Sequence, residues 1–208
     1  QFEVSPSNID QLFKDPSKTL VVFTPAVSQT NPLLSYFKSN SFQVLKRSEV
    51  LGIVTKNTRC LAVAGTHGKT TTTSILAHLL YQNNEQMTAF IGGVSENYQS
   101  NFIQRGTEIS VVEADEFDRS FLTLSPDFAC ITSMDADHLD VYGSAEDMAA
   151  TFKEFVQKIK PSGKLFIKKG LPFDGITYGV NEPADYSALK VRILKGAYCF
   201  DIQTPSEL

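Results

Sequence analysis

The chain has 208 residues, a length that holds one complete α/β domain or one domain with part of another. Its 19 basic and 23 acidic residues give a formal net charge of −4, and no block of Lys and Arg is long enough to neutralise several phosphates of a nucleic acid. The hydrophobic content of 42% is ordinary for a globular protein, and the apolar runs are far shorter than the roughly 20 residues that a membrane-spanning helix needs. The composition therefore argues against a nucleic-acid-binding, a membrane-spanning and a disordered protein.

The three cysteines are Cys60, Cys130 and Cys199, a number and spacing that fit neither a disulfide framework nor a zinc site. This usage favours a reducing, cytoplasmic compartment. The chain begins with Gln1 and ends without a closing pattern, so we expect it to be a piece of a longer protein.

The first part of the chain alternates short apolar stretches with segments of helical period, which is the pattern of an α/β fold. Asn31 followed by Pro32 predicts the capped start of a helix. The polar stretch 56–59 marks the expected domain boundary. The other elements expected before this boundary are strands over 20–23 and 42–45 and a helix over 48–54.

After the boundary, the alternation continues and predicts a mainly parallel sheet flanked by helices. A helix beginning near residue 69 has Ile75, Leu76, Leu79 and Leu80 on one predicted face. The remaining expected strands lie over 60–64, 88–91, 109–112, 128–132, 165–167, 176–178, 191–194 and 198–202.

Two local patterns define further boundaries in this second part. Ser144 and Asp147 form an approximate capping box ahead of another helix. Lys195 and Gly196 predict the turn of a hairpin between the last two strands, which we expect to close an edge of the sheet.

The segment 65–71 reads Gly-Thr-His-Gly-Lys-Thr-Thr and lies between a predicted strand and a predicted helix. Its glycines let backbone amides face an anion, and a helix N-terminus favours negative charge. Lys69 can reach the outer phosphates of a nucleotide, and the Thr70 hydroxyl can bind magnesium. The generic motif has another glycine where this chain has Val63. The segment predicts a nucleotide-binding site; a glycine turn that binds nothing is the alternative.

Two later strand ends are rich in carboxylates, which a phosphoryl-transfer site needs to hold its metal. The first is the sequence Glu-Ala-Asp-Glu-Phe-Asp at 113–118, and the second, at 135–140, contains His138. Neutral imidazole binds divalent metals, so His138 is a candidate ligand. A solvated acidic loop and a surface or packed histidine are the alternatives.

Three smaller features stay open on the sequence alone. His67 lies inside the loop, where its ring can contact phosphate or point to solvent. His78 lies in the middle of a predicted helix, where a structural role is expected. Gly92 and Gly93 allow either the close approach of a ligand or a plain turn.

Three segments together resemble the central domain of the Mur ligases, the ATP-dependent amide-forming enzymes of peptidoglycan synthesis. They are the Gly-Thr-His-Gly-Lys-Thr-Thr-Thr loop at 65–72, the acidic hexad at 113–118 and Asp-His-Leu-Asp at 137–140. The loop of this family resembles Gly-Thr-x-Gly-Lys-Thr, which accounts for Val63. Within the family, the chain most resembles the branch that joins L-alanine to UDP-N-acetylmuramate.

The resemblance implies a role for each site residue. Lys69 would bind the β- and γ-phosphates of ATP, Glu113 would bridge a magnesium ion, and His138 would bind a second magnesium ion near the γ-phosphate. These three residues are the expected catalytic residues, and Thr70, Glu113 and His138 are the expected metal ligands. The expected nucleotide-binding residues are Gly65, Thr66, His67, Gly68, Lys69, Thr70 and Thr71.

Three further positions can be compared with the family. Residues 24–27, Thr-Pro-Ala-Val, resemble the segment that contacts the UDP-sugar. Phe152 stands where several members carry a carbamylated lysine, as in the alanine-adding branch. Ser133 stands where the family pattern has asparagine, which leaves a side-chain contact there open.

The resemblance also implies the domain organisation. Residues 1–55 would be part of a Rossmann-like domain that binds the UDP-sugar. Residues 56–208 would be an incomplete ATP-binding central domain, a P-loop-type, mainly parallel sheet flanked by helices. A third domain, which binds the amino acid, would be absent.

The implied activity is that of an ATP-dependent ligase, with ATP and Mg²⁺ and without a nucleic-acid or membrane partner. It would activate the lactoyl carboxylate of UDP-N-acetylmuramate as an acyl phosphate and join it to L-alanine. Three alternatives stay open. They are a ligase that adds a recycled tripeptide to the same sugar nucleotide, a folylpolyglutamate synthetase, whose motifs fit less well, and an ATP-binding module without ligase activity.

Overall fold

The computed structural model describes residues 13, 15–135 and 144–205. It divides into two compact units, Gln1–Val54 and Thr55–Leu208. The division falls just before the polar stretch 56–59. The ligand-binding roles expected for the two parts stay predictions.

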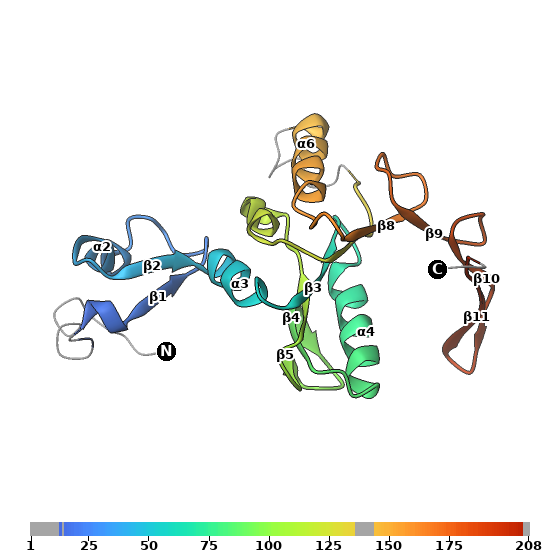
Figure 1. Ribbon diagram of the computed structural model, residues 1–208, viewed down its shortest axis with the longest axis horizontal. Helices are drawn as coiled ribbons and strands as arrows, with labels where there is room; N and C mark the ends of the chain where they lie inside the picture. Colours follow the sequence, from blue (N-terminus) through green and yellow to red (C-terminus); the bar gives the residue numbers. More distant parts are fainter. Residues whose placement is uncertain (1–12, 14, 136–143, 206–208) are drawn as a thin grey trace. The chain divides into compact units, whose positions relative to one another are not determined.

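In the first unit, a crossover helix connects two parallel strands (Figure 1). Asn31 caps this helix, because its side-chain oxygen accepts hydrogen bonds from the amides of Leu33 and Leu34. Pro32 occupies the first turn, so the helix start predicted from Asn-Pro is confirmed. The elements of this unit are the 3-10 helix η1 (Pro16–Lys18), β1 (Leu20–Phe23), α2 (Pro32–Ser39), β2 (Gln43–Lys46) and α3 (Arg47–Thr55).

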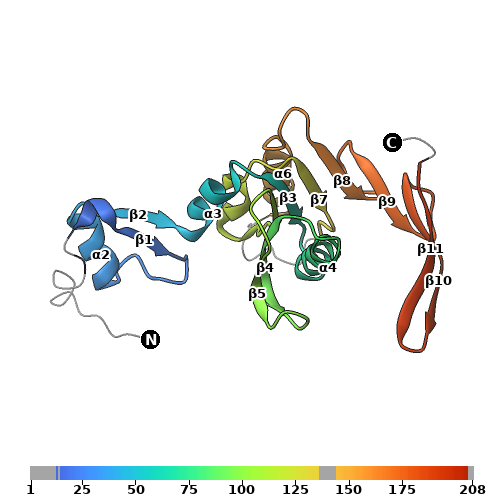
Figure 2. The same cartoon turned by 60° about the horizontal axis from the view of Figure 1, so that its bottom comes forward.

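In the second unit, the described strands form one sheet in the order β11-β10-β9-β8-β7-β3-β6-β4-β5 (Figures 1 and 2). Among them, the edge pairs β4·β5 and β10·β11 are antiparallel and the other pairs are parallel. The predicted α/β class with a mainly parallel sheet is thus confirmed. The strands are β3 (Arg59–Ala64), β4 (Met87–Ser95), β5 (Ser100–Gln104), β6 (Ile109–Glu113), β7 (Phe128–Ile131), β8 (Lys164–Lys168), β9 (Ile176–Val180), β10 (Tyr186–Leu194) and β11 (Ala197–Gln203).

The two ends of the sheet compare differently with the sequence prediction. The hairpin of β10 and β11 turns at Lys195 and Gly196, as predicted, and both residues have positive φ. Strand β5 was not predicted. Only Ile103 of its five residues is buried. An edge strand that buries so little needs no alternation of apolar and polar residues, and this alternation is the signal by which a strand is predicted.

Helix α4 (Lys69–Gln82) packs against β4, β6 and β3. Its predicted apolar face is only partly right. Leu76 and Leu80 pack against the buried core around Met87, as expected. Ile75 and Leu79 are 56% and 54% exposed, because they lie on the flank of the helix, beside an apolar groove that strands β7 and β8 also line.

Helix α6 (Ala145–Val156) begins at the predicted cap, where Ser144 Oγ accepts a hydrogen bond from the Asp147 amide at 3.0 Å. The 3-10 helix η2 (Phe117–Thr123) connects β6 to β7 and contacts α6. The ring of Phe121 stacks on that of Phe155, with 4.6 Å between centroids, and meets Phe152 edge-on. None of the described helices combines the length and apolar character that crossing a bilayer requires.

Candidate functional site

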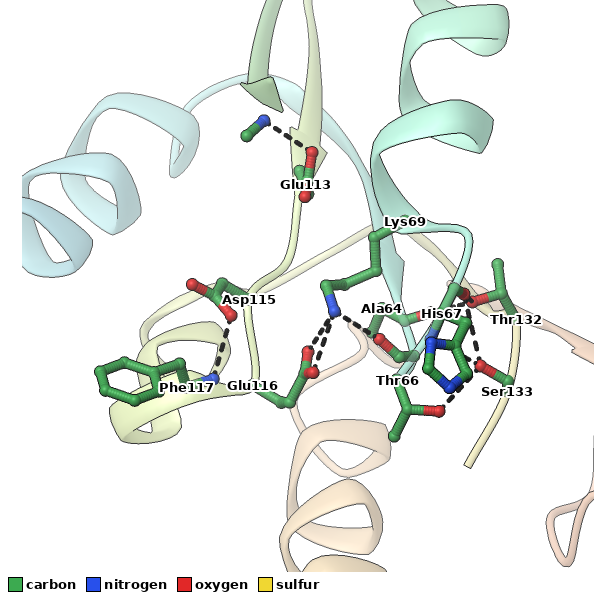
Figure 3. A network of polar contacts seen from close by, with 12 residues as sticks. Ala64, Thr66, His67, Lys69, Glu113, Asp115, Glu116, Phe117, Thr132 and Ser133 are labelled. Carbon is green, nitrogen blue, oxygen red and sulfur yellow. Dashed lines mark hydrogen bonds and ion pairs between the residues drawn. The ribbon is translucent and has the colours of Figure 1, made fainter. Parts of the chain in front are cut away.

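The loop between β3 and α4 lies beside the ends of β6 and β7, since these strands flank β3 in the parallel sheet (Figure 3). Gly65 is buried, with φ +135°, and a Cβ at this position would lie 2.9 Å from the Ser133 amide nitrogen. Glycine is therefore required for the loop to approach the segment after β7. Gly68 at the helix N-cap provides no side-chain hydrogen bond, so first-turn amides of α4 can face an anion.

Ser133 anchors the loop from the end of β7. Its Oγ accepts a hydrogen bond from the His67 amide at 2.8 Å and lies 2.9 Å from Thr66 Oγ1. Thr66 Oγ1 in turn accepts a hydrogen bond from the Asp135 amide at 3.0 Å. The contact that the sequence left open at Ser133 is thus made by serine, and it holds the backbone of the loop.

The side chain of Lys69, at the start of α4, points toward Glu116 in the segment after β6 (Figure 3). Its Nζ donates a hydrogen bond to the Gly65 carbonyl at 2.7 Å and lies 2.9 Å from each carboxylate oxygen of Glu116. The two side chains are 14% and 7% exposed, so this is an ion pair largely removed from water. Sequence reasoning gave Glu116 no role of its own. Its place three residues after Glu113, in the acidic segment that follows β6, is the signal that could have found it.

Glu113 contacts the next residue of the loop. Its Oε1 accepts a hydrogen bond from the Thr70 hydroxyl at 2.8 Å, and its Oε2 accepts one from the Gly92 amide at 2.6 Å. A Cβ on Gly92 would lie 2.5 Å from Glu113 Oε1, so the glycine is required here for the close approach of a carboxylate.

The oxygens of Thr70 and Glu113 are hard ligands of the type that Mg²⁺ prefers, so the donor set fits this ion. In the described part of the chain, no group of three or more His, Cys, Asp or Glu side chains could hold a metal ion. Thr70 and Glu113 would supply two of the ligands, and Mg²⁺ commonly takes others from phosphate and water oxygens.

The remaining predicted site residues differ in how far the structure describes them. His138 lies outside the described residues. The side chain of His67 is exposed, and Thr71 is an exposed residue in the first turn of α4. His78 Nδ1 lies 3.0 Å from the Tyr98 hydroxyl, which is consistent with a structural role.

The structure also describes Phe152 and residues 24–27, the other positions compared with the family. Phe152 is fully buried in the core, at the position where the family resemblance places a modified lysine in other members. Residues 24–27 form a turn in the first unit, in which the Val27 amide donates a hydrogen bond to the Thr24 carbonyl at 3.0 Å.

The family model described as the Mur ligase middle domain matches residues 63–188, which include the loop, Glu113 and Glu116. The chain belongs to the Mur ligase family. The matched segment covers more than half of the chain and contains most strands of the large sheet, so the family resemblance stated from three short segments is confirmed.

Curated Mur ligases are similar to this chain over nearly its whole length. The UDP-N-acetylmuramate–L-alanine ligase of Flavobacterium johnsoniae is 54% identical over 216 residues, which cover 99% of this chain and 48% of the relative. The enzyme of the same name from Flavobacterium psychrophilum is 55% identical over 202 residues, covering 96% and 45%. The chain thus spans about half the length of the curated relatives it matches.

Solved Mur ligase structures have the same fold. The UDP-N-acetylmuramate-alanine ligase MurC of Thermotoga maritima matches with a TM-score of 0.70 and 28% identity, over 81% of this chain and 40% of that chain. The UDP-N-acetylmuramate:L-alanyl-gamma-D-glutamyl-meso-diaminopimelate ligase of Neisseria meningitides matches with a TM-score of 0.79, over 96% of this chain and 68% of that chain. At 19% identity, the second match indicates the fold alone.

Proposed function

We propose that this Mur ligase chain is part of an enzyme that uses ATP to join L-alanine to the lactoyl carboxylate of UDP-N-acetylmuramate, in peptidoglycan precursor synthesis. The identity of 54% and 55% to ligases of that name is the observation that carries the proposal. The tripeptide-adding alternative has weaker support, because two solved ligases of that kind are 19% and 21% identical to the chain, whereas a solved alanine ligase is 28% identical.

In the proposed reaction, an oxygen of the lactoyl carboxylate attacks the γ-phosphorus of ATP, and the bond to the bridging oxygen of the leaving ADP breaks. The amine of L-alanine then attacks the acyl phosphate, inorganic phosphate leaves, and the amine loses a proton. Both steps require positioning of the reactants and stabilisation of phosphoryl charge.

The loop residues have the chemistry for the first step. First-turn amides of α4 and the Lys69 ammonium would hold the outer phosphates of ATP, with Gly65, Thr66, His67, Gly68 and Thr71 forming the surrounding loop. Thr70 and Glu113 would hold one Mg²⁺, and His138 would hold a second. When bound, Mg²⁺ would neutralise part of the charge on the β- and γ-phosphates.

We assign ATP to the second unit, which contains the loop, and the UDP-sugar to the first unit, which contains the turn at 24–27. The proposed compartment is the cytoplasm, which the free thiols of Cys60, Cys130 and Cys199 favour.

The first test of this proposal is nucleotide binding. The whole chain is titrated with Mg-ATP by calorimetry, beside the variant Lys69→Ala. We expect the wild-type chain to bind and the variant to lose on the order of a hundredfold in affinity, because it lacks the cation nearest the phosphates. Equal affinity of the two proteins would contradict the role of Lys69.

The second test separates the candidate activities. Phosphate release is measured in an enzyme of the relatives' full length that contains this chain, with UDP-N-acetylmuramate and either L-alanine or the tripeptide. Release that depends on L-alanine supports the proposal, and release that depends on the tripeptide favours the recycling ligase. Binding of ATP without release in either case would indicate an ATP-binding module without ligase activity.

A further inference from the structure

We propose that Glu116 is a positioning residue for Lys69, whose ammonium its carboxylate holds inside the loop before a nucleotide binds. The inference rests on the proposed nucleotide site and adds a residue to it. Glu116 acts through Lys69 and is not itself placed in contact with the reactants.

Burial makes the two charges depend on each other. With side chains 14% and 7% exposed, neither Lys69 nor Glu116 has much water around its charge. Because a buried charge without a partner is strongly unfavourable, each side chain keeps the other in place. Both carboxylate oxygens lie 2.9 Å from Nζ, which restricts the lysine to one region of the loop.

The geometry also leaves the lysine able to bind a phosphate. An ammonium group has three N–H donors. In Lys69, one is directed at the Gly65 carbonyl and another at Glu116. The pair therefore fixes the side chain without using its whole hydrogen-bonding capacity.

The backbone around Glu116 is held in an unusual turn. Its carbonyl accepts a hydrogen bond from the Arg119 amide at 3.1 Å, and Asp118 and Arg119 have φ of +51° and +54°. Such angles are unfavourable for residues other than glycine. The two residues form a kink inside η2, directly after Glu116, whose buried side chain lies beside Lys69.

Two carboxylates of the acidic hexad at 113–118 thus contact neighbouring residues of the loop. Glu113 binds the Thr70 hydroxyl and Glu116 binds Lys69. Asp115 instead accepts a hydrogen bond from the Phe117 amide at 3.0 Å and so stabilises the start of η2. A lysine already held in the loop loses less conformational freedom when a nucleotide binds, which raises affinity.

The test compares Mg-ATP affinity of the whole chain with Glu116→Gln, Lys69→Met and the double variant. We expect Glu116→Gln to weaken binding about tenfold, because the amide keeps the size of the side chain but loses the charge that holds the lysine. In the Lys69→Met background, the same change should alter the residual affinity, measured at millimolar nucleotide, by less than about twofold. Glu85→Gln, which removes an exposed carboxylate between α4 and β4, is the matched control and should bind like wild type.

The free energy of unfolding, measured without nucleotide, gives a second double-mutant cycle for the same pair of residues. Glu116→Gln alone should destabilise the chain, and the double variant should recover part of the loss, because it contains no unpaired lysine. If the single variant does not fold and the double variant does, the same coupling is demonstrated.

Three results would overturn the inference: unchanged or tighter binding by Glu116→Gln, additive effects of the two substitutions on affinity, or additive effects on unfolding. Failure of the wild-type chain to bind Mg-ATP would instead remove the nucleotide site itself, and the positioning role with it.

Discussion

Thr66 and Ser133, which are 67 residues apart in the chain, share a buried hydrogen bond of 2.9 Å between their hydroxyl oxygens. Ser133 Oγ also accepts a hydrogen bond from the His67 amide at 2.8 Å. One side chain at the end of β7 therefore sets the backbone of a loop that follows β3. The loop is held by the neighbouring strand as well as by its own glycines.

Substitution of Ser133 by alanine should weaken the loop. The His67 amide and the Thr66 hydroxyl would each lose a partner, at a cost of about 1–3 kcal/mol in the free energy of unfolding. Urea unfolding measures this cost, and Mg-ATP titration should show a parallel loss of affinity. Ser162→Ala, in an exposed turn, is the control and should change the free energy by less than about 0.5 kcal/mol. Equal stability of the two variants would contradict an anchoring role for Ser133.

Substitution of Gly65 by alanine should destabilise the chain more than the same change at Gly170. Both glycines have positive φ, +135° and +91°, so both variants carry backbone strain. A Cβ at residue 65 would also collide with the backbone after β7, whereas one at residue 170 would meet no atom within 4 Å. We expect about 1 kcal/mol for Gly170→Ala and at least about 3 kcal/mol for Gly65→Ala, measured by urea unfolding. A smaller loss at residue 65 than at residue 170 would show that the loop relaxes.

Asp127 gives a prediction about pH. Burial raises the pKa of its carboxyl group, but the hydrogen bonds from Lys160 Nζ and the Cys60 amide, each 2.8 Å long, outweigh burial and hold the pKa below its usual value of 3.8. The folded state therefore favours the ionised carboxylate. This stabilisation is fully present above the unfolded pKa and is lost as the pH falls through the lower, folded pKa.

Asp127→Asn should accordingly lower the free energy of unfolding by about 1 kcal/mol at pH 7, and by progressively less as the pH falls below about 4. Chemical unfolding of both proteins across this pH range measures the difference. Asp174→Asn, at an exposed residue, is the matched control. A difference that is constant with pH would mean that the carboxylate charge is not responsible.

His138 can be tested through the magnesium dependence of nucleotide binding. If His138 is a metal ligand, His138→Ala should raise the Mg²⁺ concentration needed for half-maximal ATP binding several-fold. The reason is that a metal site binds its ion more weakly when one of its ligands is removed. His78→Ala, which removes the side chain beside Tyr98, is the control and should leave the titration unchanged. An unchanged titration for His138→Ala as well would count against ligation.

The order of most elements could be predicted from the sequence, because their signals are local. Asn31 and Pro32 define the start of α2, and Ser144 defines the start of α6, each through hydrogen bonds within one helical turn. The phosphate loop is equally local, since its residues are consecutive. Prediction failed where burial depends on distant partners, as for the edge strand β5 and for Ile75 and Leu79 of α4.

The sequence by itself determined the α/β class, the loop with Lys69 and Thr70, and the acidic character of the strand ends. Only the tertiary structure decided which carboxylate meets which loop residue. Lys69 and Glu116 are 47 residues apart, and they meet because β3 and β6 pair in parallel and end at the same edge of the sheet. The kink at Asp118 and Arg119, which contains no glycine and therefore has no local sequence signal, was likewise visible only in the structure.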